Sequence, residues 1–179
     1  MLKIYIPPRE LFNDNLNEFI TINGTTLTLE HSLLSISKWE SKWHKPFLVK
    51  EPKTNDEIMS YIECMVLNSA FDKTVLLGLT DKNFKQVKDY IEDSMTATTF
   101  SDIHSKPNRE IVTSELIYYW MVALNIPFEC QKWHINRLLT LIRICNIKNQ
   151  PPKKMNVSQI RSRNRAINDA RRKALHTKG

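Results

Sequence analysis

FITINGTTLTLEHSLLSISKWESKW (residues 19–43) decides the fold, because the spacing of its apolar residues changes partway along. In residues 25–29, Leu27 and Leu29 alternate with threonines, which is the period of two expected of a half-buried strand. From residue 32 onward the apolar residues are three and four apart, as in an amphipathic helix: Leu33, Ile36, Trp39 and Trp43. The sequence therefore predicts strands up to residue 31 and helices after it.

The strands before residue 31 are predicted to form a hairpin. Lys3 to Ile6 is a short β-prone run that Pro7-Pro8 stops. Asn23-Gly24 separates two runs rich in β-branched residues, and this dipeptide favours the positive φ angles of a type I′ turn. We therefore expect residues 19–22 to pair with residues 25–29 around Asn23-Gly24.

The rest of the chain carries helix signals. Only three glycines are present, which disfavours an all-β fold with many tight turns and excludes a glycine-rich phosphate loop. The predicted fold class is α+β, mostly helical, with a short N-terminal antiparallel β-hairpin or small sheet followed by a bundle of about five to six helices. After residue 50, a capping box at Thr54–Glu57 begins a helix with Ile58, Ile62 and Met65 inward, and a second helix is expected over 81–93 with Phe84, Val87 and Ile91 inward. Thr113 is expected to cap a helix that is apolar all round and therefore buried on most sides. Pro127 ends that helix, and a further helix is expected over 132–147.

Positive charge is concentrated at the end of the chain. Residues 151–179 contain nine Lys or Arg and one acid, whereas residues 1–150 contain 17 bases and 18 acids. Pro151-Pro152 cannot continue a helix and predicts a linker. We therefore expect a compact body over 1–150, β-rich over 1–31 and helical over 32–150, and a basic C-terminal helical arm over 151–179.

No residue pattern predicts catalysis. Cys130 and His134 are four apart and Cys145 lies further on, a spacing that a zinc site or a cysteine nucleophile could use. Structural zinc sites usually have two close ligand pairs, and here there is one, so buried thiols and a hydrogen-bonded imidazole are favoured. The carboxylates are scattered on mixed-charge helix faces. We expect no catalytic residue, no metal and no cofactor, and hence no enzyme.

Two groups of residues are candidates for partner binding. Trp39, Trp43 and Phe47 lie among lysines, so they could stack nucleic-acid bases or form a protein interface. Their spacing favours the alternative that they pack in the core. On the arm, Arg161, Arg165 and Arg172 share a helical face that could meet phosphates, anionic lipid or an acidic protein groove, or remain solvated.

Several stretches spread over the chain carry a family resemblance: Ser35–Trp43 with Lys45-Pro46-Phe47-Leu48, Met95–Thr98, Thr113-Ser114-Glu115 with Tyr118–Met121, Ile126–Cys130, Trp133–Ile142, and in the arm Lys153–Met155, Arg163–Arg165, Asn168 and Arg171-Arg172. With these stretches the chain resembles tail assembly chaperones of long-tailed, siphovirus-type bacteriophages over nearly its whole length. One departure is Thr99-Phe100, where the family pattern has Trp-Phe.

This resemblance implies a non-enzymatic role in tail morphogenesis. The family is taken to bind the long helical tape-measure protein, keep it in solution and recruit tail-tube subunits, with self-association as a further expectation. It implies residence in the cytoplasm of the bacterial host and absence from the mature virion. The longest uncharged apolar stretch, residues 116–126, is about half of the roughly 20 residues that span a bilayer, so no membrane partner is expected. A structural virion protein and a nucleic-acid-binding module that uses the arm remain the alternatives.

Overall fold

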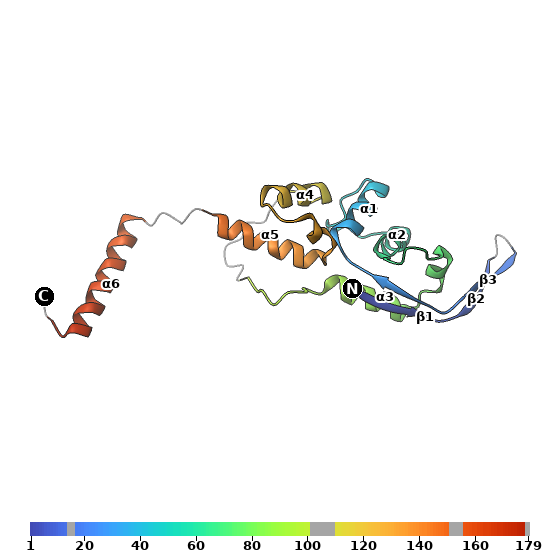
Figure 1. Ribbon diagram of the computed structural model, residues 1–179, viewed down its shortest axis with the longest axis horizontal. Coiled ribbons are helices and arrows are strands. Elements are labelled where there is room, and N and C mark those ends of the chain that lie inside the picture. The colour runs from blue at the N-terminus through green and yellow to red at the C-terminus, as the bar shows by residue number, and fades with distance from the viewer. Residues whose placement is uncertain (14–16, 101–109, 151–155, 178–179) are drawn as a thin grey trace. The chain divides into compact units, whose positions relative to one another are not determined.

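The chain divides into two units in the computed structural model, which describes residues 1–13, 17–100, 110–150 and 156–177 (Figure 1). Met1–Asn146 forms the first unit and Ile147–Gly179 the second. The described residues form four strands, six α-helices and two 3-10 helices, so the predicted fold class, α+β and mostly helical, is confirmed. The division falls inside the last helix before the predicted Pro151-Pro152 linker, which itself lies outside the described residues.

The strands form the expected small antiparallel sheet, but the predicted pairing of residues 19–22 with residues 25–29 is wrong. β1 (Leu2–Ile6) pairs with β4 (Thr25–Leu29), and β2 (Arg9–Asn13) pairs with β3 (Glu18–Ile22) (Figure 1). The register runs from Leu2 opposite Leu29 to Arg9 opposite Ile22 without an offset, so the two pairs follow one another along one ribbon. The chain reverses between β2 and β3, and the turn predicted at Asn23-Gly24 is wrong.

The reason for this difference lies opposite Asn23-Gly24. Pro7 and Pro8 have no N–H to donate, so the ladder is interrupted where they face Asn23 and Gly24. Gly24 does not adopt a positive φ angle. A Cβ atom there would lie 2.7 Å from the Tyr5 hydroxyl, so this glycine permits a close approach instead of a turn.

Two helices follow the ribbon. α1 (Leu33–Trp43) begins at the cap residue Ser32 and ends at His44, whose φ angle is 53°. α2 (Asn55–Met65) begins with the predicted capping box, in which Thr54 and Glu57 bond each other's backbone N–H groups. After α2, the Leu67 N–H donates to the Thr28 carbonyl oxygen at 2.9 Å, so this segment covers the outer edge of β4. The 3-10 helix η1 (Lys73–Gly78) comes next.

The next helix packs on the opposite strand. α3 (Asp81–Glu92) has a second capping box, formed by Thr80 and Asn83, which the sequence analysis missed. The Asn83 side-chain amide also donates to the Tyr5 carbonyl oxygen at 3.2 Å, and α3 packs on β1. The ribbon thus has α3 on the β1 side and the end of α2 on the β4 edge.

The remaining helices correct two predictions. α4 (Ser114–Ala123) begins at Thr113 as predicted, but Tyr119 and Val122 are 65% and 60% exposed, so α4 is a surface helix and not buried on most sides. A short 3-10 helix, η2 (Phe128–Lys132), and extended Trp133 precede α5 (Ile135–Asn149), which therefore begins three residues later than predicted. α6 (Val157–Leu175) is the predicted helix of the arm.

A buried carboxylate joins α1 to α4. Glu40 accepts from the Phe47 N–H through Oε1 and from the Ser114 N–H through Oε2, both at 2.8 Å. Ser114 is the first residue of α4, where a negative charge is favoured by the unpaired N–H groups of the helix. One side chain therefore accepts hydrogen bonds from two buried backbone N–H groups, those of Phe47 and Ser114, which are 67 positions apart in the sequence.

We predict that Glu40→Ala lowers the free energy of unfolding by about 2–4 kcal/mol, because it leaves both N–H groups buried without an acceptor. Urea denaturation followed by circular dichroism measures the change. Asp89→Ala removes an exposed carboxylate from α3 and serves as the control, with an expected change within about 0.5 kcal/mol. Equal stability of the two variants would show that Glu40 does not join α1 to α4.

Candidate functional site

An apolar groove lies between α2 and α3 in the first unit. Its volume is about 430 Å³. The floor is formed by buried residues of both helices, Tyr61 and Ile62 from α2 and Val87 from α3, together with Phe47. Ile58 from α2 and Phe84 and Ile91 from α3 form its sides. A groove lined by two helices in this way is suited to an apolar helix face of a partner.

The residues on the sides of the groove were predicted to point inward. Ile58 is nevertheless 39% exposed, and Phe84 and Ile91 are only half-buried. The main packing partner of α2 is α1, whereas that of α3 is β1. Apolar residues at core spacing are thus left accessible, which is the usual sign of a surface that a partner covers.

Charged residues border this apolar surface. Lys53, Lys88 and Glu92 line the groove together with the apolar residues. Lys88 and Glu92 are one turn apart on α3, with their charged atoms 4.0 Å from each other. The Lys53 ammonium lies 4.6 Å from the centre of the Phe47 ring, in a cation–π arrangement. The groove is therefore apolar inside and charged at its margin.

The aromatic residues that were candidates for partner binding lie mostly in the core. Trp39 is 1% exposed, and its indole N–H donates to the Glu57 carbonyl oxygen at 2.9 Å. Phe47 is buried and stacks on Tyr61, while half-buried Trp43 stacks on Trp39. Trp39 therefore cannot meet a partner in this structure, because it is buried against α2. Of the three aromatic candidates, only Phe47 lines the groove, and it does so from the floor.

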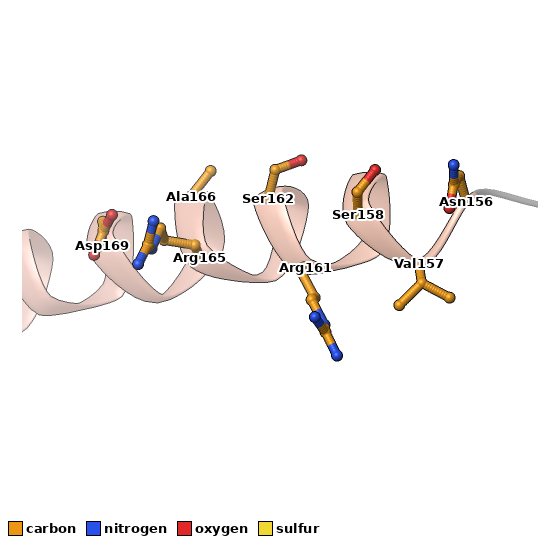
Figure 2. Close-up of a pocket in the computed structure, with 8 residues that line it drawn as sticks. All are labelled: Asn156, Val157, Ser158, Arg161, Ser162, Arg165, Ala166 and Asp169. Carbon is orange, nitrogen blue, oxygen red and sulfur yellow. The ribbon is translucent and has the colours of Figure 1, made fainter.

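The predicted arginines lie on the second unit. Arg161, Arg165 and Arg172 are exposed on α6 (Figure 2 labels the first two). The concave surface in Figure 2 is lined by residues of α6 and by Asn156, which directly precedes it. It is the open side of one helix and not an enclosed site, so it holds no small molecule by shape. The arginines remain candidates for contact with an acidic partner.

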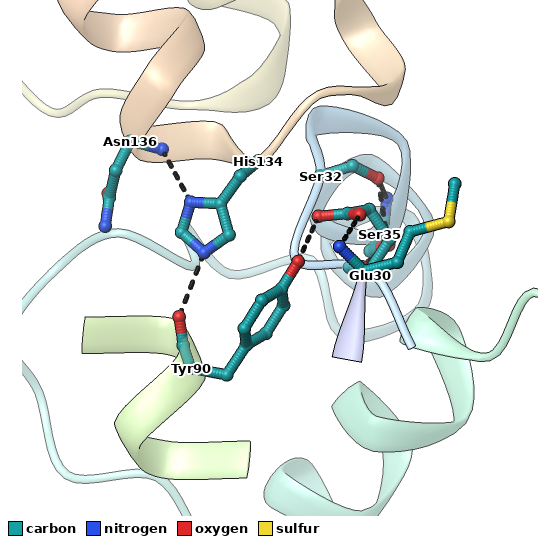
Figure 3. A network of polar contacts seen from close by, with 7 residues as sticks. Glu30, Ser32, Ser35, Tyr90, His134 and Asn136 are labelled. Atoms are coloured by element: carbon teal, nitrogen blue, oxygen red, sulfur yellow. Dashed lines mark hydrogen bonds and ion pairs between the residues drawn. The ribbon is translucent and has the colours of Figure 1, made fainter. Parts of the chain in front are cut away.

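A cluster of buried titratable residues lies where β4, α3 and the start of α5 meet. Tyr90 donates its hydroxyl to Glu30 at 2.7 Å, and the Tyr90 carbonyl oxygen accepts from Nε2 of His134 at 3.0 Å (Figure 3). The Asn136 N–H donates to Nδ1 of His134, which identifies the neutral tautomer of that ring. His31 bonds the Tyr61 hydroxyl, and its ring centre is 5.0 Å from that of His134.

This cluster is part of the core. Glu30, His31 and His134 are all less than 9% exposed, and the groove between α2 and α3 is lined by other residues. Burial, and next the neighbouring His134, lower the pKa of His31 to about 3. The His31 ring is therefore neutral at physiological pH, and both rings act as hydrogen-bonding parts of the core.

The cysteine and histidine spacing noted in the sequence does not form a ligand cluster. Cys130 lies in η2 and His134 precedes α5, so the two are not on one helix. Burial raises the pKa of the Cys130 thiol, which disfavours the thiolate that a nucleophile or a zinc ligand requires. Within residues 1–13, 17–100, 110–150 and 156–177, no three His, Cys, Asp or Glu side chains are placed to hold a metal ion. Over the same residues, no helix is both long and apolar enough to cross a membrane.

In the comparisons with known proteins, no family model, no curated protein and no solved structure matches this chain.

We predict that Trp39→Ala lowers the free energy of unfolding by about 3–5 kcal/mol, because it empties a large buried volume. It also leaves the Glu57 carbonyl oxygen without its indole donor. Chemical denaturation measures the loss, with Arg161→Ala on exposed α6 as a control that leaves stability unchanged. A stable Trp39→Ala protein would show that this side chain is not part of the core.

Acid should destabilise the protein through His31. Its folded-state pKa is about 3, below the value of about 6.5 in an unfolded chain, so below pH 6.5 the unfolded state binds a proton that the folded state does not. The contribution of neutral His31 to the free energy of unfolding is fully present above pH 6.5 and decreases as the pH falls, by about 2 kcal/mol at pH 5.

Denaturation measured from pH 7.5 to pH 5 tests this effect. His31→Asn should flatten that part of the pH dependence, whereas His44→Asn, at an exposed histidine with positive φ, should keep it. An unchanged pH dependence in His31→Asn would contradict the assignment.

Proposed function

We propose that this chain is a tail assembly chaperone of a long-tailed bacteriophage that binds helical segments of the tape-measure protein in the groove between α2 and α3. The observation that carries the proposal is the groove itself: its apolar residues Ile58, Phe84 and Ile91 have the spacing of a core, yet within the described residues they are exposed or only half-buried. The sequence resemblance supplies the biological setting. The stretches that carry the resemblance include Phe47, which lies on the floor of the groove.

The mechanism follows from exchange of apolar surface. A long helical client exposes an apolar stripe that would associate with other copies of itself in solution. The groove removes part of this stripe from water by accepting residues about one and two helical turns apart. Binding through such a small apolar area is weak enough for tail-tube subunits to displace the chaperone, and no covalent chemistry is needed.

α6 extends this proposal to a second contact. It exposes Arg161, Arg165 and Arg172, with apolar Ile160 and Ile167 also exposed. A basic helix of this kind fits an acidic surface of the tape-measure or tail-tube protein. Nucleic acid is the alternative acidic partner, and it would be recognised by binding that falls steeply as salt is raised.

We predict that co-expression with the tape-measure protein encoded beside it moves that protein from the insoluble to the soluble fraction. Ile58→Asn should abolish this effect, because it places an amide on the side of the groove. Val122→Asn, at an exposed apolar position of α4, is the matched control and should retain it. Thermal denaturation establishes that both variants are folded.

Two outcomes would contradict the proposal. One is a client that stays insoluble with the wild-type chain. The other is the chain at stoichiometric amounts in purified virions by mass spectrometry, which would favour a structural component of the particle over a chaperone.

A further inference from the structure

Lys53 occupies an unusual position at the groove. Its ammonium lies 4.6 Å from the centre of the Phe47 ring and 5.9 Å from that of Trp39, so part of its hydration shell is replaced by aromatic faces. No carboxylate of the described residues is within ion-pair distance of it, although Glu57 and Glu51 are near enough to influence its charge. Glu57 is instead bonded to Lys45, at 2.6 Å.

The other charges of the margin are already paired with each other. Lys88 faces Glu92 on the same helix, and this exposed pair leaves the α3 side of the groove close to neutral. Burial lowers the pKa of Lys53, and the nearby carboxylates of Glu57 and Glu51 only partly offset this effect. Lys53 is therefore the charged group of the groove that gains most from a new carboxylate.

The apolar rows of the groove define the length of helix that fits. Phe84 and Ile91 are seven residues apart on α3, which is about 10 Å along a helix axis. A partner helix lying along this row presents residues i, i+3 or i+4, and i+7 over the same distance. The groove thus takes about two turns of one amphipathic helix, and its volume of about 430 Å³ is consistent with a few apolar side chains.

We infer that the groove selects an acidic amphipathic helix: three apolar residues over two turns fill the groove, and a carboxylate beside this stripe pairs with Lys53. This inference rests on the proposed function, because it names the kind of client segment that the same groove binds. The cation–π contact holds the ammonium at the margin before binding, so less side-chain freedom is lost when the carboxylate arrives. Charge selection of this kind acts mainly through orientation and rejection of basic helices.

Two designed helical peptides test the inference. Both carry leucine at positions i, i+3 and i+7 and a fluorescent label; one has glutamates beside the leucine stripe and the other has lysines at the same positions. We expect the glutamate peptide to bind the full chain about three- to tenfold more tightly at low salt, as judged by fluorescence anisotropy. Lys53→Glu should reverse the preference and Lys53→Gln should remove it, while Lys82→Glu on α3, outside the groove lining, should retain it.

The outcomes separate this inference from the proposed function. Equal affinity of the two peptides for the wild-type chain, or a preference that survives in Lys53→Glu and Lys53→Gln, overturns the charge selection. If the tape-measure protein is still made soluble in that case, the groove remains the client site and only the inference has failed. Failure of both peptides to bind, together with an insoluble client, overturns the inference and the proposed function.

Discussion

The ribbon formed by β1 and β4 is the constraint on which the first unit depends. A two-stranded ribbon is not stable by itself in water, so its apolar face and its edges must be covered. Helices and the segments that follow them provide this cover on opposite sides: α3 packs on β1, and the chain after α2 bonds to the edge of β4. On the β1 side, the Asn83 side chain donates a hydrogen bond to the Tyr5 carbonyl oxygen. On the β4 side, the Leu67 N–H donates to the Thr28 carbonyl oxygen.

The groove is a consequence of this arrangement. α2 packs against α1 and α3 packs on β1, and of the residues that line the space between the two helices Ile58, Phe84 and Ile91 are not fully buried. Phe47 stacks on Tyr61 and closes the floor of the groove, while its opposite side stays open. The structural role of the ribbon and the proposed role in binding thus come from the same contacts. Glu40 and His31 hold α4 and α5 to this frame, and they also bond to Phe47 and Tyr61 at the base of the groove.

Local signals were predictable from the sequence, and long-range ones were not. Thr54 with Glu57, Thr113, and the spacing of Trp39 on α1 are read within a few residues, and each is found as expected. The turn predicted at Asn23-Gly24 was wrong because the local preference of this dipeptide competes with the pairing of β1 with β4, whose partners are 19 to 27 positions apart. The groove was missed for a related reason: periodicity marks Ile58 and Ile91 as apolar-face residues but does not say whether another element covers them.

The central claim is that the space between α2 and α3 receives a helix of another protein. Site-specific photocrosslinking tests it most directly, with a photoreactive phenylalanine analogue placed at position 58 on the side of the groove and, separately, at position 119 on exposed α4. The account predicts that position 58 crosslinks to the tape-measure protein, at segments whose apolar residues recur every three or four positions, and that position 119 does not. Crosslinks to that protein from position 119, with none from position 58, would contradict it.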